Sequence, residues 1–244
     1  MQNLETKTVR EIALEMPVST RIFEEFHIDY CCGGRKPFAE ACSLAGVEPD
    51  EVADRLRELE QGASGSATDF ERMPLAGLID HILEKHHVYT KDEMRQLAPL
   101  MEKVAGRHGE SHTELLILKS LVLTLFQDLA SHMAKEEAIL FPYLRELLGR
   151  QGAISSSSPA FGTVRNPLRV MMAEHDRAGE LLRKMRENTD GYTLPAEACP
   201  SYTALYTRLE ELEKDLHQHI HLENNILFPK ALELEAKVYP LAAV

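Results

Sequence analysis

The chain has 244 residues, of which 44% are hydrophobic and 27% are charged, and its formal net charge is −12. These proportions are typical of a folded globular protein, and the acidic excess argues against a nucleic-acid-binding protein, which needs clustered Lys and Arg. No run of about 18 apolar residues occurs and the first residues lack the layout of a signal peptide, so we expect a cytoplasmic protein without a membrane segment.

Residues 1–60 are predicted to form a small helical module. Apolar residues recur at helical spacing from Val9 to Met16 and from Ile22 to Phe26, and residues 38–44 and 49–59 indicate two further helices. A turn-rich segment, HIDYCCGGRKP, separates the second helix from the third. Residues 61–72 are poor in apolar side chains and contain Gly and Ser, so they are predicted to be a linker to residues 73–238.

Residues 73–238 are predicted to form four long helices, at about 74–105, 111–148, 167–187 and 195–234. The polar segment GRQGAISSSSPAFGTVRN separates the second helix from the third and suits a connection between two helical hairpins. Alternating apolar runs are short, so no β-sheet is expected. The predicted fold class is all-α: an antiparallel four-helix bundle preceded by a small helical cysteine module.

One motif occurs twice in the predicted bundle. Residues 132–147 read HMAKEEAILFPYLREL and residues 219–234 read HIHLENNILFPKALEL, so each copy has a His, a Glu four positions later, and then Ile-Leu-Phe-Pro. His87 precedes the first copy at nearly the distance at which His175 precedes the second. The repetition indicates one two-helix unit used twice, with its polar residues in equivalent places.

The repeated polar residues are predicted to bind metal. Positions i and i+4 share one face of a helix, so the His and the Glu of each copy point at a common spot. Four imidazoles and two carboxylates without thiolate suit two iron or manganese ions bridged by the glutamates, better than two separate zinc sites. The predicted ligands are His87, His132, Glu136, His175, His219 and Glu223.

The alternative for each of these residues is an ordinary structural role. A lone His on a helix is more often a core or surface residue than a ligand, and a single His-Glu pair is usually a surface ion pair. Two pairs in register, each preceded by a His, favour the metal site. The repeat places His217 and His221 off the metal face, because alanines occupy their positions in the first copy. His108 lies near the end of the first predicted helix. It would be an additional ligand only if the chain folds back toward the metal site, and this alternative is left open.

In its motifs the chain resembles a known family. The segments DYCCGG, DHILEKHH, SHMAKEEAILFP, EHDRAGELL and HLENNILFP span nearly the whole chain and are similar to those of the repair-of-iron-centres family, the ScdA/YtfE-type proteins with a hemerythrin-like di-iron bundle. The combination of a paired-cysteine module with this bundle is specific to that family. The resemblance places the iron ligands on the same six residues and the two cysteines of the family on Cys31 and Cys32.

The chain departs from oxygen-carrying hemerythrins at two positions. Gly179 stands where those proteins have a second His one turn after the third-helix His, and Glu223 follows His219 at four positions instead of five. Fewer protein ligands leave more open coordination, which suits chemistry or metal release better than a rigid carrier site.

Cys31 and Cys32 are adjacent and are followed by a Gly-Gly turn. Adjacent cysteines do not form an unstrained disulfide, so we expect free thiols. They would be exposed and reactive if their pKa were lowered, an effect that Arg35 and Lys36 would favour and Asp29 would oppose. The alternative is a tight turn with two ordinary small residues. With the resemblance, we expect the two cysteines to relay iron or electrons.

The resemblance implies a cytoplasmic stress protein that repairs iron–sulfur clusters damaged by nitric oxide or oxidants. Its cofactor would be two non-haem iron ions, its partners damaged iron–sulfur proteins, and its mechanism the donation of iron. Two alternatives remain: a di-iron nitric oxide reductase, which would form nitrous oxide, and a hemerythrin-like sensor of O2 or nitric oxide, which would bind its gas reversibly without losing iron. We expect a monomer or a homodimer.

Overall fold

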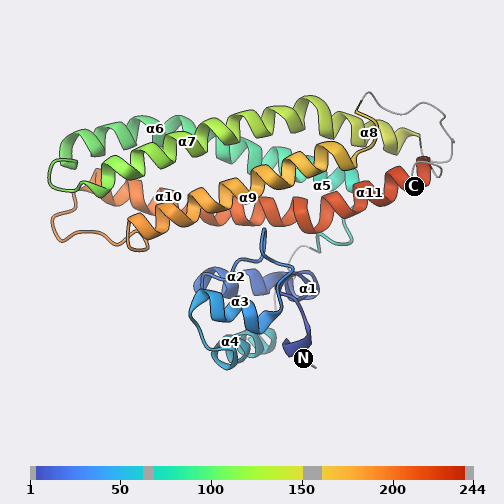
Figure 1. Ribbon diagram of the computed structural model, residues 1–244, viewed down its shortest axis with the longest axis horizontal. Coiled ribbons are helices and arrows are strands. Elements are labelled where there is room, and N and C mark those ends of the chain that lie inside the picture. Colours follow the sequence, from blue (N-terminus) through green and yellow to red (C-terminus); the bar gives the residue numbers. More distant parts are fainter. Residues whose placement is uncertain (1–3, 63–68, 151–160, 240–244) are drawn as a thin grey trace.

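The computed structural model describes residues 4–62, 69–150 and 161–239. Within these ranges the chain is all-α, with a long four-helix bundle and a smaller helical module against the middle of one side (Figure 1). The predicted fold class is therefore confirmed. The division at residues 61–72 stays a prediction, because residues 63–68 of this segment lie outside the described ranges.

The described part of the module contains η1 (Leu4–Thr6), α1 (Val9–Glu15), η2 (Pro17–Ser19), α2 (Thr20–Glu25), α3 (Phe38–Ala45) and α4 (Pro49–Gly62). α1 begins with a capping box, in which Thr8 Oγ1 accepts a hydrogen bond from the Glu11 N–H and the Glu11 carboxylate accepts one from the Thr8 N–H. α3 ends at Gly46, whose φ of 73° favours glycine. The helices meet in one apolar core around Phe23 and Tyr30.

The described part of the bundle consists of four long helices. The first joins α5 (Leu75–His81), η3 (Ile82–His87) and α6 (Val88–His108), and the second joins α7 (Glu114–Lys135), η4 (Glu136–Leu140) and α8 (Phe141–Gly149). The third is α9 (Arg165–Asn188), and the fourth joins α10 (Pro200–His221), η5 (Leu222–Leu227) and α11 (Phe228–Val238). Neighbouring helices run in opposite directions, as expected for two sequential hairpins (Figure 1).

Three of the long helices contain a π-helical turn, η3, η4 or η5, beside the predicted metal ligands. His87 ends η3, Glu136 begins η4, and Glu223 lies in η5. A π turn inserts an extra residue into a helix and is frequent at functional sites. Both Phe-Pro steps follow directly after a π turn, at the start of α8 and of α11. The shifted backbone there accommodates a proline, which has no N–H to donate to the preceding turn.

Two apolar cores lie along the bundle, one on each side of the predicted ligands. One core contains Leu78, Phe141 and Phe228, and the other contains Leu118 and Leu209. Fully burying such side chains contributes about 1.5–3 kcal/mol each. The polar residues between them are therefore held by an apolar core on either side.

The second long helix, Glu114–Gly149, is long and apolar enough to cross a membrane by length and composition alone. In the bundle its α7 segment packs against α6 and α9, with Leu118, Val122 and Leu125 fully buried. A core helix passes the same test as a membrane span, so this single helix is weak evidence for a membrane. The absence of a membrane segment stays a prediction.

The module contacts the bundle through polar groups. Asn225 Nδ2 donates to the backbone oxygen of Tyr30 at 3.1 Å, and Arg10 donates to the backbone oxygen of Asn225 at 3.0 Å. His217 of α10 lies 2.9 Å from Glu24 of α2. These contacts place the module against the fourth long helix, at α10 and η5.

We expect the contact between module and bundle to weaken as the pH rises. Burial lowers the pKa of His217, but the hydrogen bond to Glu24 and the charges of Glu24 and Glu213 outweigh it, so the pKa lies above its ordinary value of 6.5. A group with a raised pKa in the folded state stabilises that state fully below its unfolded pKa and loses this effect as pH rises through its folded pKa. Amide exchange in residues 4–62, corrected for intrinsic rates, should therefore be faster at about pH 9 than at about pH 6.

The matched variants are His217→Gln and His112→Gln. His112 pairs with Glu114 and Glu197, away from the module, so its replacement should leave the pH effect intact. His217→Gln should abolish most of it. Equal exchange at both pH values in the unmodified protein would contradict the assignment.

Candidate metal centre

The six residues predicted from spacing lie together inside the bundle. They form two groups of potential ligand atoms, each within 4.8 Å of one another. Both groups contain the two glutamates, and each adds two histidines from different helices. The first group is His87, Glu136, His219 and Glu223, and the second is His132, Glu136, His175 and Glu223.

The two glutamates lie between the histidine pairs. Glu136 Oε2 lies 3.3 Å from Nε2 of both His87 and His132. Glu223 lies 3.1 Å from His175 Nε2 and 3.2 Å from His219 Nε2. Each carboxylate therefore faces one imidazole from each group, as a bridging ligand requires.

The donor set fits a pair of metal ions. Both carboxylate oxygens of Glu136 and of Glu223 are buried without a hydrogen-bond partner among the described residues, as are His87 Nε2 and His219 Nε2. Buried polar atoms are rarely left without a partner unless they serve a function. Two imidazoles and two carboxylates per position suit iron or manganese. We infer a metal-binding centre at these residues.

Burial and charge act in opposite directions at these groups. Burial raises the pKa of Glu223, but the charge of His219 and the nearby ring nitrogens of His175 and His219, 3.1 and 3.2 Å away, outweigh it and hold the pKa well below its ordinary value. Burial lowers the pKa of His132, but the charge of Glu136 raises it to about 9. The two carboxylates therefore stay ionised, and His132 must release a proton when a metal binds.

Three predicted ligands have a hydrogen-bond partner for their second ring nitrogen. His87 Nδ1 lies 2.7 Å from Glu137, and His132 Nδ1 lies 2.9 Å from Glu174. His175 Nδ1 lies 2.9 Å from Asn224 Oδ1. Such partners fix the ring so that Nε2 faces the metal, and they raise the basicity of the ligand. The partner carboxylates themselves pair with Lys91 and Lys135.

Helical spacing did not identify these hydrogen-bond partners of the histidines. Glu137 directly follows Glu136, Glu174 directly precedes His175, and Asn224 directly follows Glu223. A polar residue adjacent to each ligand was the available signal. Helical periodicity alone does not show that the residue next to one ligand bonds to another ligand on a different helix, as each of these three does.

The remaining histidines lie away from the ligand atoms. His108 as an additional ligand is wrong: its Nε2 lies 3.3 Å from Cys199 Sγ, and the 21 residues of α6 separate it from His87 by about 30 Å. His217 and His221 lie off the metal face, as the repeat predicted, and contact Glu24 and Tyr30 of the module. His86, adjacent to His87, is buried and stacks on His219, with its Nδ1 3.0 Å from Asp215.

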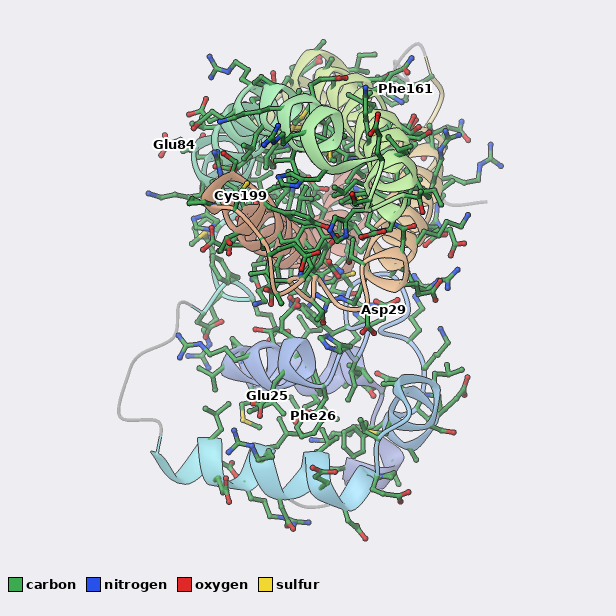
Figure 2. The ribbon with its side chains drawn as sticks, turned by 90° about the vertical axis from the view of Figure 1, so that its left-hand side faces the viewer. Glu25, Phe26, Asp29, Glu84, Phe161 and Cys199 are labelled. Atoms are coloured by element: carbon green, nitrogen blue, oxygen red, sulfur yellow. The ribbon has the colours of Figure 1, made fainter. Side chains whose placement is uncertain are left out.

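Asp29 lies on the module loop that meets the bundle (Figure 2), and Cys31 and Cys32 follow it in the same loop. The Asp29 carboxylate accepts hydrogen bonds from the backbone N–H groups of Cys31, Cys32 and Gly33 at 2.9–3.0 Å. Cys32 Sγ lies 3.5 Å from the backbone oxygen of His175. The loop therefore wraps around one carboxylate and places a thiol beside a predicted ligand.

Cys31 does not meet the condition for an exposed, reactive thiol, and the opposing effect expected of Asp29 prevails. This residue is 5% exposed, and its Sγ contacts Asp29 at 3.4 Å. The hydrogen bond with Cys32, together with burial and the negative charge of Asp29, raises the pKa of the Cys31 thiol well above its ordinary value. The nearest charge is therefore Asp29, and not Arg35 or Lys36. Both thiols are free.

Two cavities lie near the cysteines and the centre. A cleft of about 670 Å³ between module and bundle is lined by Cys31, Cys32, Gly179 and Arg183, among others, but by none of the six predicted ligands. A second cavity of about 20 Å³ adjoins His132, His175 and His219 and is otherwise lined by four apolar residues and two acidic ones: Leu129, Ala178, Leu216, Ile220, Asp128 and Glu174. The first is wide enough for a partner's side chains, and the second has room for about one water-sized molecule.

Gly179 determines how closely Cys32 approaches the bundle. A Cβ atom at this position would lie 3.5 Å from Cys32 Sγ, so alanine fits and a larger side chain does not. We expect Gly179→Leu to displace the cysteine loop, because overpacking costs about 1–3 kcal/mol, a factor of about ten or more in the population of the closed arrangement. In a Cys199→Ser background, the rate of Cys32 labelling by a thiol reagent measures this displacement.

The control is Gly106→Leu in α6, where a Cβ atom meets nothing within 4 Å. This variant should label at the unmodified rate. If Gly179→Leu also labels at that rate, the close packing of Cys32 on α9 is wrong.

Two family models match the chain. The hemerythrin HHE cation binding domain matches residues 78–231, and ScdA_N, a domain of unknown function, matches residues 5–60. The first match covers more than half of the chain and contains all six predicted ligands. The second contains both adjacent cysteines.

Proteins named iron-sulfur cluster repair protein YtfE are similar over nearly the whole chain. The one from Escherichia coli O157:H7 is 36% identical over 222 residues, which cover 91% of this chain and 94% of that protein. Those from Salmonella paratyphi B and Salmonella newport are 35% identical over the same lengths. The similarity therefore includes the module as well as the bundle.

Proposed function

Because this chain belongs to the hemerythrin HHE family and to the family of the YtfE iron-sulfur cluster repair proteins, we propose that it repairs iron–sulfur clusters damaged by nitric oxide or oxidants. The iron is held as a pair by His87, His132, Glu136, His175, His219 and Glu223, with both glutamates as bridges. One iron is then delivered to the damaged cluster. The protein acts in the cytoplasm, and its partners are damaged iron–sulfur proteins.

One observation carries this proposal: the thiol of Cys32 lies beside a predicted iron ligand and also lines a cleft open to a partner. Its Sγ is 3.5 Å from the His175 backbone oxygen, and the cleft between module and bundle reaches both cysteines. A storage or carrier protein would need no thiol at this place. Thiolates bind iron well, so Cys31 and Cys32 are suited to take up an iron that leaves the histidines and pass it to the partner.

The residues of the chain have separate tasks in this mechanism. The glutamates and histidines hold the cargo iron, which in its bound form supplies Lewis acidity and redox capacity. The Asp29 carboxylate holds the cysteine loop by accepting hydrogen bonds from the backbone N–H groups of Cys31 and Cys32. Cys32 gives up a proton as it binds iron, because only the thiolate is a metal ligand. The nearby cleft accepts the surface of the damaged protein.

The test is repair of an inactivated enzyme. A [4Fe–4S] dehydratase is inactivated with nitric oxide and then incubated anaerobically with the iron-loaded protein. Activity should recover in proportion to the iron lost by the protein. The metal-free protein and the Glu136→Ala, Glu223→Ala double variant serve as controls, and equal recovery with either of them would contradict the proposal.

The small apolar cavity beside His132 and His175 favours a second candidate, the reduction of nitric oxide. An apolar space of about 20 Å³ next to the centre admits a diatomic gas more readily than a polar substrate. Two nitric oxide molecules, two electrons and two protons would give nitrous oxide and water. Catalytic formation of nitrous oxide with a chemical reductant, without loss of iron, would favour this reductase over the donor.

A further inference from the structure

The two halves of the centre differ in their connection to the module. His132 and His175 belong to one group and His87 and His219 to the other. The His175 ring bonds through Nδ1 to Asn224 Oδ1 at 2.9 Å. Among the described residues, neither ring nitrogen of His219 has a hydrogen-bond partner, and its ring stacks on another imidazole. The two metal positions therefore differ in how their histidines are oriented: the His175 ring is held by Asn224, whereas the His219 ring has no hydrogen-bond partner among the described residues.

Asn224 makes a second contact, to the cysteine loop. Its Nδ2 donates to the backbone oxygen of Cys31 at 3.4 Å, while its Oδ1 faces His175. Asn224 is 9% exposed, so water replaces neither partner without rearrangement. A side-chain amide has its donor and acceptor on one rigid group, so the contact to Cys31 sets which end of Asn224 faces the imidazole.

We propose that Asn224 is a positioning residue that couples the docking of the cysteine module to the retention of one iron, the one held by His132 and His175. With the module docked, Asn224 is held in the orientation that fixes the His175 ring. When the loop moves away, Asn224 is free to rotate and His175 loses the partner that orients it. The iron at His87 and His219 keeps its own support, from Glu137, and is insensitive to the module.

This coupling gives the proposed donor a physical reason to keep its iron until a partner arrives. A protein that enters the cleft contacts the loop of Cys31 and Cys32 directly and is therefore placed to move it. The same movement loosens the iron that lies beside Cys32. The inference rests on the proposed iron centre but does not require that a cluster is the acceptor.

The experiment follows the release of both irons from the full-length protein to a ferrous chelator by stopped-flow absorbance. Loss of the partner of a metal-bound histidine typically weakens binding by about ten- to a hundredfold. We expect Asn224→Ala and Gly179→Leu each to accelerate release of one of the two irons by about this factor. The double variant should release iron no faster than the faster single variant, because both changes break the same connection.

Two further variants make the test specific. Glu137→Gln removes the partner of His87 and should accelerate release of the other iron, so that in combination with Gly179→Leu each iron leaves at the rate seen in its own single variant. Asn224→Asp keeps an oxygen for His175 but removes the donor to Cys31. It should therefore hold the iron at nearly the unmodified rate, and adding Gly179→Leu should change nothing further. This rescue separates a positioning role from a general loss of folding.

The outcomes distinguish the two proposals. Suppose that the protein holds two irons. If Asn224→Ala and Gly179→Leu multiply in their effects on the release rate, or if each accelerates both irons equally, the coupling is wrong and the proposed function stands. If the unmodified protein holds no pair of irons, both fail. If Asn224→Asp releases iron as fast as Asn224→Ala, Asn224 does not act through its oxygen and the inference is overturned.

Discussion

Replacing Glu136 and Glu223 with alanine is expected to lower the iron content from two ions per chain to nearly none. Both carboxylates belong to both groups of ligand atoms, so their loss removes half of the donors from each position. Their oxygens are fully buried and have no hydrogen-bond partner among the described residues, which leaves metal as their natural counterpart. Mass spectrometry of iron, manganese and zinc per chain measures the effect.

Single variants sharpen this prediction. Glu136→Ala should weaken both positions, whereas His87→Ala should empty mainly one, because His87 belongs to a single group. Glu235→Gln is the matched control. Glu235 is also buried in the bundle, but its carboxylate accepts hydrogen bonds from Tyr143 and the Val164 N–H. Two irons retained after loss of both Glu136 and Glu223 would refute the bridged pair.

Replacing Cys31 and Cys32 with serine is expected to leave both irons in place but to slow their transfer to a damaged cluster by about tenfold or more, since a hydroxyl is a much poorer iron ligand than a thiolate. Neither cysteine belongs to the groups of ligand atoms in the bundle, so the iron content should not change. Serine is close to cysteine in size, and the Asp29 carboxylate bonds to the backbone N–H groups of the loop, so the loop should keep its conformation.

The measurement compares iron content and the rate of cluster repair in the same preparations. Cys42→Ser and Cys199→Ser are the controls: Cys42 is buried in the module core, and Cys199 lies beside His108 at the end of α6. Repair at the unmodified rate by the Cys31→Ser, Cys32→Ser protein would show that iron leaves by another route.

The bundle and the meeting of the six predicted ligands inside it are predictable from sequence because both depend on one periodicity. A His and a Glu four residues apart share a helix face in any α-helix, and the repetition of this pair shows which face points inward. The π turns at His87, Glu136 and Glu223 were not expected from the spacing. Each inserts one extra residue into its helix beside the predicted ligand that it contains.

The environment of the cysteines is not predictable in this way. Arg35 and Lys36 are close to Cys31 in sequence, but the charge that contacts its thiol is Asp29. The orientation of a loop follows from its hydrogen bonds and from the surface on which it packs, and the packing surface here is contributed by α9, more than a hundred residues later. His108 shows the same limit, because only the fold brings it next to Cys199.

The central claim is that iron atoms move from this protein into a damaged cluster, and isotope labelling tests it most directly. The protein is loaded with ⁵⁷Fe and incubated with a cluster protein that was damaged by nitric oxide and contains only unlabelled iron. After separation of the two proteins, Mössbauer spectra should show ⁵⁷Fe in the restored [4Fe–4S] cluster and a matching loss from the donor. A restored cluster without ⁵⁷Fe would contradict donation and direct attention to the removal of nitric oxide instead.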